Sequence, residues 1–234
     1  GPEAMLPLID QPEDLCFLKS CMALPRLSEW PTTRFKPRRE VDMMNDRHHF
    51  RPPGDGIPLL EGKHLAPYFL NSAARTRDVG PDAQRHTGAP RIAWRAVADR
   101  AMRRRLIAAV VPDNVALGNS LIYSDITETN PHRHLMWLLA FLNSRVAEAQ
   151  LRLWCSNNNI NIFHLRACRA PLLDESRAAS TLVDLAEAAS EHGVISHDQA
   201  HALDEGWREW FRMPDSVWDR AVLARTHPVS IWSN

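Results

Sequence analysis

The chain has 234 residues, of which 44% are hydrophobic, and this is enough for the buried core of one large domain or two small ones. No run approaches the ~18 consecutive apolar residues of a transmembrane helix, and no basic segment followed by an apolar run marks a secretory signal. The four cysteines are too few for a disulfide scaffold, and they have no CxxC spacing that would hold zinc. We therefore expect an intracellular protein with no membrane partner.

Charge is unevenly distributed although the formal net charge is zero. Residues 26–105 contain 17 Lys or Arg against 9 Asp or Glu, whereas residues 171–234 contain 5 against 11. Of the 28 cationic residues 25 are arginine, whose planar guanidinium forms paired hydrogen bonds with phosphate or guanine. A GC-rich genome also explains an excess of arginine over lysine, but it does not explain the clustering. The basic segment therefore indicates an anionic partner.

Strand patterns are concentrated in the first half of the chain. The alternation over residues 91–97 predicts a half-buried strand that presents Arg91 and Arg95 on its polar face. The continuous apolar run over residues 106–111 predicts a central strand, and residues 118–126 predict a third one. Together these segments predict a small mixed sheet.

One long helix is expected in the middle of the chain. Asn130 and Pro131 are typical of a helix start, and apolar residues then recur at helical spacing up to residue 153. The run of residues 156–159 ends this helix, and a short apolar element follows over residues 160–165. Because apolar residues occupy nearly all faces of its first half, the helix should be buried.

The last third of the chain has helical periodicity. Ser176 and Gly193 have the residue types of a helix start and end, Ser196 with Gln199 forms a capping box, and Pro214 opens a last helix. The expected core of this tail consists of Trp207, Trp210, Phe211 and Trp218. The sequence thus predicts an α+β fold, with a mixed α/β domain over residues 1–170 and a helical subdomain over residues 171–234.

Motifs for methyl transfer are absent from the sequence. No glycine-rich turn follows a strand, as an S-adenosylmethionine site requires, and no Asn/Asp-Pro-Pro-aromatic loop is present to hold a flipped adenine. We therefore expect no catalytic residue, metal or cofactor in this chain. Asp55, Glu61 and Lys63 imitate the carboxylate and lysine set of magnesium-dependent nucleases, so a small nuclease stays an alternative.

Several segments occur in an order typical of one family. The segments are REVDMMNDRHHF (39–50), IPLLEGKHL (57–65), RIAWRAVA (91–98), RLIAAVVP (105–112), LGNSLIY (117–123), LLAFLNS (138–144) and NINIF (159–163). In order and spacing they resemble the target-recognition region of type IIG restriction-modification enzymes and BREX-type phage-defence methyltransferases. The resemblance covers residues 39–172. It leaves out the long acidic tail, and the family's catalytic domain is missing.

The resemblance implies the partners of the chain. In this family the region docks on double-stranded DNA beside the methyltransferase domain of the same parent chain, which binds S-adenosylmethionine and methylates adenine in the bacterial cytoplasm. Whether the parent also cuts DNA is left open. The opening Gly1-Pro2-Glu3-Ala4 before Met5 resembles the remnant of a cleaved tag and suggests a piece of a longer protein.

The expected DNA-reading residues lie outside the regular elements, where side chains can reach a groove. They are Arg38, Arg39, Arg47, Arg103, Arg104, Asn157, Asn158 and Asn159. Arginine pairs with guanine and asparagine with adenine, each with about 1–3 kcal/mol of discrimination. Arg91 and Arg95 are expected to face phosphates or solvent. The alternative is a protein-interaction module that binds a partner through Trp207, Trp210 and Trp218 of the tail.

Overall fold

The computed structural model describes residues 6–83 and 88–226, so the tag-like opening, residues 1–5, lies outside the described residues. The helices are α1 (Pro12–Met22), α2 (Pro131–Leu142), α3 (Arg145–Trp154), α4 (Ile162–Ala167), α5 (Arg177–His192), α6 (His197–Trp210), α7 (Asp215–Val217) and α8 (Ala224–Thr226). The strands are β1 (Pro37–Arg38), β2 (Phe50–Arg51), β3 (Ile57–Leu60), β4 (Leu65–Ala66), β5 (Phe69–Leu70), β6 (Asp78–Val79), β7 (Arg91–Arg95), β8 (Ala108–Val111), β9 (Ala116–Leu117) and β10 (Leu121–Asp125). The predicted α+β class is confirmed.

A four-stranded antiparallel sheet has the order β1-β10-β7-β8. The three predicted strands are confirmed as β7, β8 and β10, but the prediction of a central strand over residues 106–111 is wrong, because β8 lies at the sheet edge. The run is apolar throughout because both faces of β8 are covered. Ala108 lies in the main core, whereas Ala109 and Val111 lie in a second apolar cluster.

Strand β7 is buried on both faces, so the prediction of a half-buried strand with a polar face is wrong. Arg91 is fully buried and its Nη1 lies 2.9 Å from Oε2 of Glu40, which is also buried. The Arg91 guanidinium also donates to the carbonyl oxygens of Pro112 and Val115. A buried charge is tolerated when it is paired and hydrogen-bonded in this way. Arg91 therefore stabilises the fold and does not face phosphates.

The predicted long helix is two helices, α2 and α3. They are separated at Asn143 and Ser144, and the Ser144 hydroxyl accepts from the Ala147 N–H at 3.1 Å to start α3. The Asn143 amide donates to the carbonyl of Ala108 at 2.9 Å and accepts from its N–H at 3.0 Å. The break thus satisfies backbone groups at the β8 edge. Apolar periodicity continues across it, which is why the sequence pattern does not reveal it.

The predicted boundaries of the tail helices are confirmed. Ser176 caps α5 by accepting from the N–H of Ala179, and Gly193 ends the helix in the left-handed conformation at φ 66°. Ser196 and Gln199 form the predicted capping box at the start of α6. The last helix begins after Pro214, but a π-helical stretch, Trp218–Leu223, separates α7 from α8.

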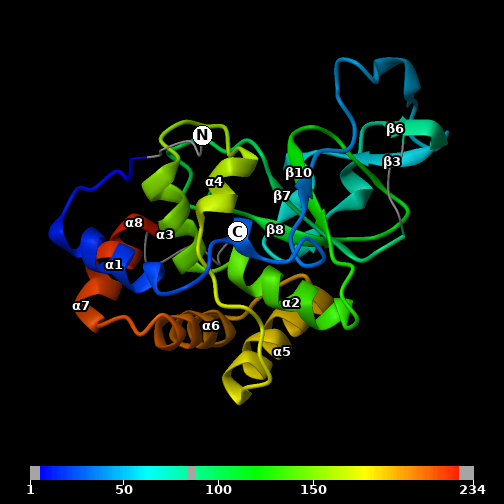
Figure 1. Cartoon of the computed structure of the whole chain (residues 1–234). Helices are drawn as coiled ribbons and strands as arrows, with labels where there is room; N and C mark the ends of the chain where they lie inside the picture. The colour runs from blue at the N-terminus through cyan, green and yellow to red at the C-terminus, as the bar shows by residue number, and fades with distance from the viewer. Residues whose placement is uncertain (1–5, 84–87, 227–234) are drawn as a thin grey trace.

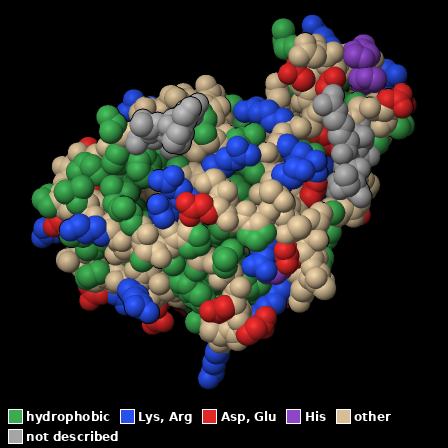
Figure 2. All heavy atoms as spheres, in the orientation of Figure 1, with side chains coloured by type: hydrophobic (Ala, Val, Ile, Leu, Met, Phe, Trp, Pro, Cys, Tyr) green, Lys and Arg blue, Asp and Glu red, His purple; other side chains and the backbone are tan. Residues whose placement is uncertain are grey.

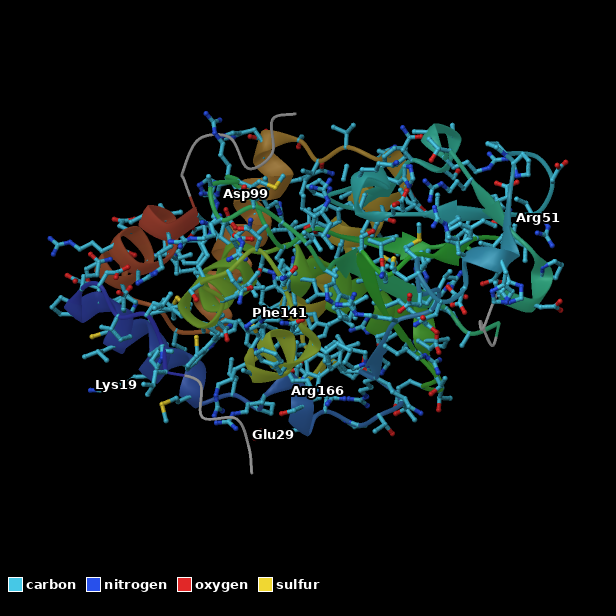
Figure 3. All side chains as sticks on the ribbon, turned by 90° about the horizontal axis from the view of Figure 1, so that it is seen from above. Lys19, Glu29, Arg51, Asp99, Phe141 and Arg166 are labelled. Carbon is cyan, nitrogen blue, oxygen red and sulfur yellow. The ribbon has the colours of Figure 1, made fainter. Side chains whose placement is uncertain are left out.

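The tail helices share one apolar core with the rest of the chain. The Trp137 ring of α2 lies 4.9 Å from the Trp207 ring and 5.0 Å from the Trp210 ring of α6, measured between centroids. Figure 1 shows α2 and α5 side by side beneath the strands β7, β8 and β10. In Figure 3, Phe141 of α2 lies near the middle of the molecule. The buried core therefore contains side chains from both sides of Pro171.

A second sheet of order β2-β6-β3-β9 extends away from the helices. Its strands β3 and β6 stand at the upper right of Figure 1, at the opposite side of the molecule from α1 and α7. We call residues 42–60 and 75–79, which include β2, β3 and β6, the projecting lobe. Across residues 6–83 and 88–226, no helix has both the length and the apolar character needed to cross a membrane.

Candidate nucleic-acid interface

The three predicted asparagines form an exposed turn, here called the asparagine turn (Asn157, Asn158 and Asn159). Asn158 accepts at its carbonyl from the Ala98 N–H and at its side-chain oxygen from the Arg100 N–H, both at 2.9 Å. Asn159 forms an antiparallel β-bridge with Val97. These bonds place the asparagine turn beside the loop that carries the exposed Arg103, so the structure brings four of the predicted residues together.

A buried arginine holds the backbone of the asparagine turn through hydrogen bonds from the protein interior. Arg105, which is 2% exposed, donates to the carbonyl of Cys155 at 2.7 Å and to the carbonyl of Asn157. Its guanidinium also contacts the Cys155 sulfur at 3.3 Å. Arg152 donates to the carbonyl of Met102 at 2.7 Å and so holds the neighbouring loop. Because hydrogen bonds to a charged donor are strong, they fix the shape of the turn.

Arg104 does not lie on the surface, so the prediction that it reaches a groove is wrong. It is 6% exposed, its Nε donates to the carbonyl of Leu106 at 2.9 Å, and its Nη2 donates to the carbonyl of Asn143. The chain enters the edge of the sheet at this point, which carries the side chain inward. Of the three consecutive arginines only Arg103 is exposed.

A pocket lies beside the asparagine turn, and its lining residue Val97 forms the β-bridge with Asn159. It is lined by Glu61, Gly62, Lys63, Arg95, Val97 and Ser120. The Arg95 guanidinium is half-buried and donates to the carbonyl of Leu65. Its pKa is lowered by burial, but arginine stays charged at neutral pH. The Ser120 hydroxyl accepts from the Gly62 N–H at 2.9 Å.

The nuclease alternative gains no site from this pocket. Glu61 and Lys63 do line it, with Glu61 Oε2 and Lys63 Nζ 3.2 Å apart, but Asp55 belongs to the exposed loop before β3 and is absent from the lining. Within residues 6–83 and 88–226, no three His, Cys, Asp or Glu side chains are grouped to hold a metal ion.

Two further predicted residues, Arg38 and Arg39, lie on the sheet side of this surface. Arg39 is exposed and donates to the carbonyl of Asn119, next to the pocket residue Ser120. Arg38 forms an ion pair with the buried Asp125 and lies over the Tyr123 ring at 5.2 Å from its centroid. Arg39 therefore extends the exposed surface. The prediction that Arg38 lies outside the regular elements is wrong, because it belongs to β1 and its side chain is held against the sheet by Asp125.

The projecting lobe carries the remaining predicted residue, Arg47, together with other cations. Arg47 is exposed, and Arg51 is exposed and donates to the carbonyls of His48 at 3.3 Å and Phe50 at 3.2 Å. The Arg77 guanidinium lies 5.7 Å from the centre of the Phe50 ring. Figure 2 shows histidine and arginine or lysine side chains at the tip of the lobe, and Figure 3 places Arg51 at the opposite end of the molecule from Lys19.

We call the exposed and half-buried cations and polar groups between Arg39 and the asparagine turn the basic strip. Its members are Arg39, Lys63, Arg95, Ser120, Arg100, Arg103, Asn157, Asn158 and Asn159. Figure 2 shows several Lys and Arg side chains across the middle of one face, between the helical part and the lobe. In the described part of the chain, no carboxylate lies within ion-pair distance of Arg39 or Arg95. Carbonyl partners satisfy hydrogen bonds without cancelling charge, and the five cations of the strip outnumber the carboxylates of the same segments, Glu61 and Asp99.

The tryptophans of the tail do not form an exposed surface. Trp207 is fully buried, Trp218 is 6% exposed, and Trp210 packs partly buried against the main core. The alternative of a partner-binding face made by these three side chains is therefore wrong for Trp207 and Trp218. Their apolar area is used within the protein itself.

Comparison with known proteins assigns no family. No protein-family model matches the chain, and no curated protein matches it. The interface is therefore defined by its own geometry. The sequence named Lys63 only in the nuclease alternative and expected Arg95 to face phosphates or solvent. Their grouping with Ser120 was not predicted, because the three residues come from separate segments and no local signal connects them. The sequence does contain a signal for the exposure of Arg51, because Pro52, Pro53 and Gly54 directly after it are typical of an exposed loop.

Proposed function

We propose that this chain reads the sequence of double-stranded DNA as the target-recognition part of an adenine-specific DNA methyltransferase of a restriction-modification or phage-defence system. One observation carries the proposal. The asparagine turn and the Arg103 loop are joined by backbone hydrogen bonds on an exposed surface that continues to Arg39. Asparagine is the side chain that pairs with adenine, and arginine the one that pairs with guanine.

The way each side chain is held indicates which residues would contact bases and which would contact phosphates. The asparagine turn is supported by buried Arg105, and a fixed backbone is what base reading requires. Arg47, Arg51 and Arg77 on the projecting lobe are exposed cations suited to phosphates. Methyl transfer belongs to the methyltransferase domain of the parent chain, which would bind S-adenosylmethionine. This chain contributes recognition and no catalytic group.

Binding to a duplex of random sequence tests the basic surface. Arg103→Ala and Arg51→Ala should each weaken binding at low salt and reduce the salt slope by about 0.9, because each neutralises about one phosphate. Fluorescence anisotropy at several salt concentrations measures both quantities. Arg177→Ala is the matched control, since Arg177 is an exposed arginine on α5, away from the strip. Equal losses in all three variants, or no binding by the wild type, would contradict the proposal.

Base reading needs a variant that leaves the fold unchanged, and Asn159 offers one. Within the described part of the chain its side chain makes no hydrogen bond, whereas the Asn157 and Asn158 side chains accept from backbone N–H groups. Asn159→Ala in the parent enzyme should cost about 1–3 kcal/mol at one base position and relax specificity there. Sequencing of methylated sites reads this out. An unchanged site with unchanged affinity would remove Asn159 from the reading surface.

A further inference from the structure

The pocket beside Val97 occupies the middle of the basic strip. It shares Val97 with the β-bridge to Asn159, and its Ser120 follows Asn119, whose carbonyl accepts from Arg39. Any group bound there would therefore contact the protein between the two ends of the proposed reading surface. The lining contains two cations and one carboxylate, which leaves an excess of one positive charge.

Two donors of this pocket, Arg95 and Ser120, have no carboxylate partner in residues 6–83 and 88–226, whereas Lys63 pairs with Glu61. Arg95 is half-buried, donates to a single carbonyl, and has no carboxylate within ion-pair distance in residues 6–83 and 88–226. The Ser120 oxygen accepts from Gly62, which leaves its own hydroxyl proton to donate. Lys63 is exposed, and its Nζ lies 3.2 Å from Oε2 of Glu61, the one carboxylate in the lining of the pocket. A guanidinium, an ammonium and a hydroxyl are the donor set that phosphate oxygens accept.

We propose that the Arg95, Lys63 and Ser120 pocket binds a phosphate group. Under the proposed function, on which this step rests, the phosphate is a backbone phosphodiester of the bound duplex. Phosphate contacts fix the register of a protein on DNA, while base contacts specify the sequence. A phosphate held at the middle of the strip would set where the asparagine turn and Arg39 meet the base edges. Glu61 opposes this binding, because its carboxylate competes for Lys63.

Charge changes of opposite sign in the pocket test the proposal. Lys63→Gln and Arg95→Gln should each weaken binding of duplex about tenfold at low salt and lower the salt slope by about 0.9. Glu61→Gln should instead tighten it, because it releases Lys63. Glu191→Gln, on the exposed end of α5, is the control with the same charge change and should leave affinity unaltered. Lys63 and Glu61 are partly exposed, so these two variants keep the test valid if Arg95→Gln fails to fold.

A second titration separates this proposal from the proposed function. Inorganic phosphate and a mononucleotide are titrated into the wild type and Lys63→Gln, and the amide NMR signals of Gly62 and Ser120 are followed. If DNA binds and the pocket variants change nothing, the phosphate pocket is wrong and DNA recognition stands. If duplex does not bind but phosphate or nucleotide shifts these signals through Lys63, the pocket stands with a free phosphate ligand and DNA recognition is wrong. No response to any of the three overturns both.

Discussion

Several arginines in the helical part of the molecule pair with carboxylates, whereas Arg39 and Arg95 of the basic strip and Arg51 of the lobe bond to backbone carbonyls. In the helical part the nitrogen to oxygen separations include 2.8 Å for Arg208 with Glu205, 2.7 Å for Arg220 with Glu13 and 2.6 Å for Arg225 with Asp14. On the other side, Arg39 and Arg51 donate to carbonyls. A chain with no net charge thus has a local excess of positive charge, because the five cations of the basic strip outnumber the two carboxylates of the same segments, Glu61 and Asp99.

The largest effect is expected where an arginine of the sheet half does have a carboxylate, at the buried Arg91 and Glu40 pair. Glu40→Ala should lower the free energy of unfolding by about 3–5 kcal/mol, because it leaves the Arg91 charge buried without a counterion. It also removes the acceptor of the Leu117 N–H, at 3.0 Å. Urea unfolding followed by tryptophan fluorescence measures the change. A cost below about 1 kcal/mol would mean that the pair is not buried in solution.

A double variant serves as the control for that experiment. Arg91→Met with Glu40→Leu removes both charges, so it should recover much of the stability lost in Glu40→Ala. Recovery would assign the cost to the unpaired charge. Equal destabilisation of both variants would assign it to lost packing or to the Leu117 contact instead.

A smaller effect is expected at the buried pair of the helical half, Arg145 and Asp204, whose side chains meet at 2.6 Å. Burial raises the pKa of Asp204 to about 6, although the neighbouring Arg145 favours the charged form. The folded protein therefore holds this proton more tightly than the unfolded chain. The stability that the proton provides is complete below about pH 4 and is lost as the pH rises through about 6, by up to about 3 kcal/mol.

Asp204→Asn isolates this titration, because the amide does not ionise. As the pH rises from about 4 to about 7, the unfolding free energy of the wild type should fall relative to that of Asp204→Asn. Urea unfolding across this range measures it, and taking the difference cancels the other carboxyl groups. A difference that stays constant with pH would show that Asp204 ionises at its ordinary pKa.

The tail was predictable in detail because its signals are local. Ser176, Gly193, Ser196 and Gln199 act within a few residues of themselves, so their capping roles can be read from spacing. The break at Ser144 is also capped locally, but the apolar periodicity on both sides concealed it. The burial of Arg91 depends on Glu40, which is 51 residues away, and no pattern within a window contains both.

The candidate site was predictable only in part for the same reason. Asn157, Asn158 and Asn159 stand out as a polar run between apolar segments, and they are exposed as expected. In the run of three arginines at 103–105, sequence alone does not tell which side chains turn inward. The folded chain decides this, because Arg104 and Arg105 bond to the carbonyls of residues 143, 155 and 157, which come close to the two arginines only in the folded state.

The smallest effect is expected at the exposed pair of Arg220 and Glu13. This pair also tests whether duplex affinity depends on where a charge lies or only on the net charge of the protein. Arg220 is 67% exposed, so Glu13→Gln should cost less than about 1 kcal/mol of unfolding free energy, part of it from the favourable position of Glu13 in the first turn of α1. The substitution adds the same unit of positive charge as Glu61→Gln but frees an arginine far from the basic strip. Duplex affinity at low salt should therefore be unchanged in Glu13→Gln and increased in Glu61→Gln. If both variants bind duplex equally more tightly, net charge governs the affinity, and the contrast between the two halves of the molecule has no part in binding.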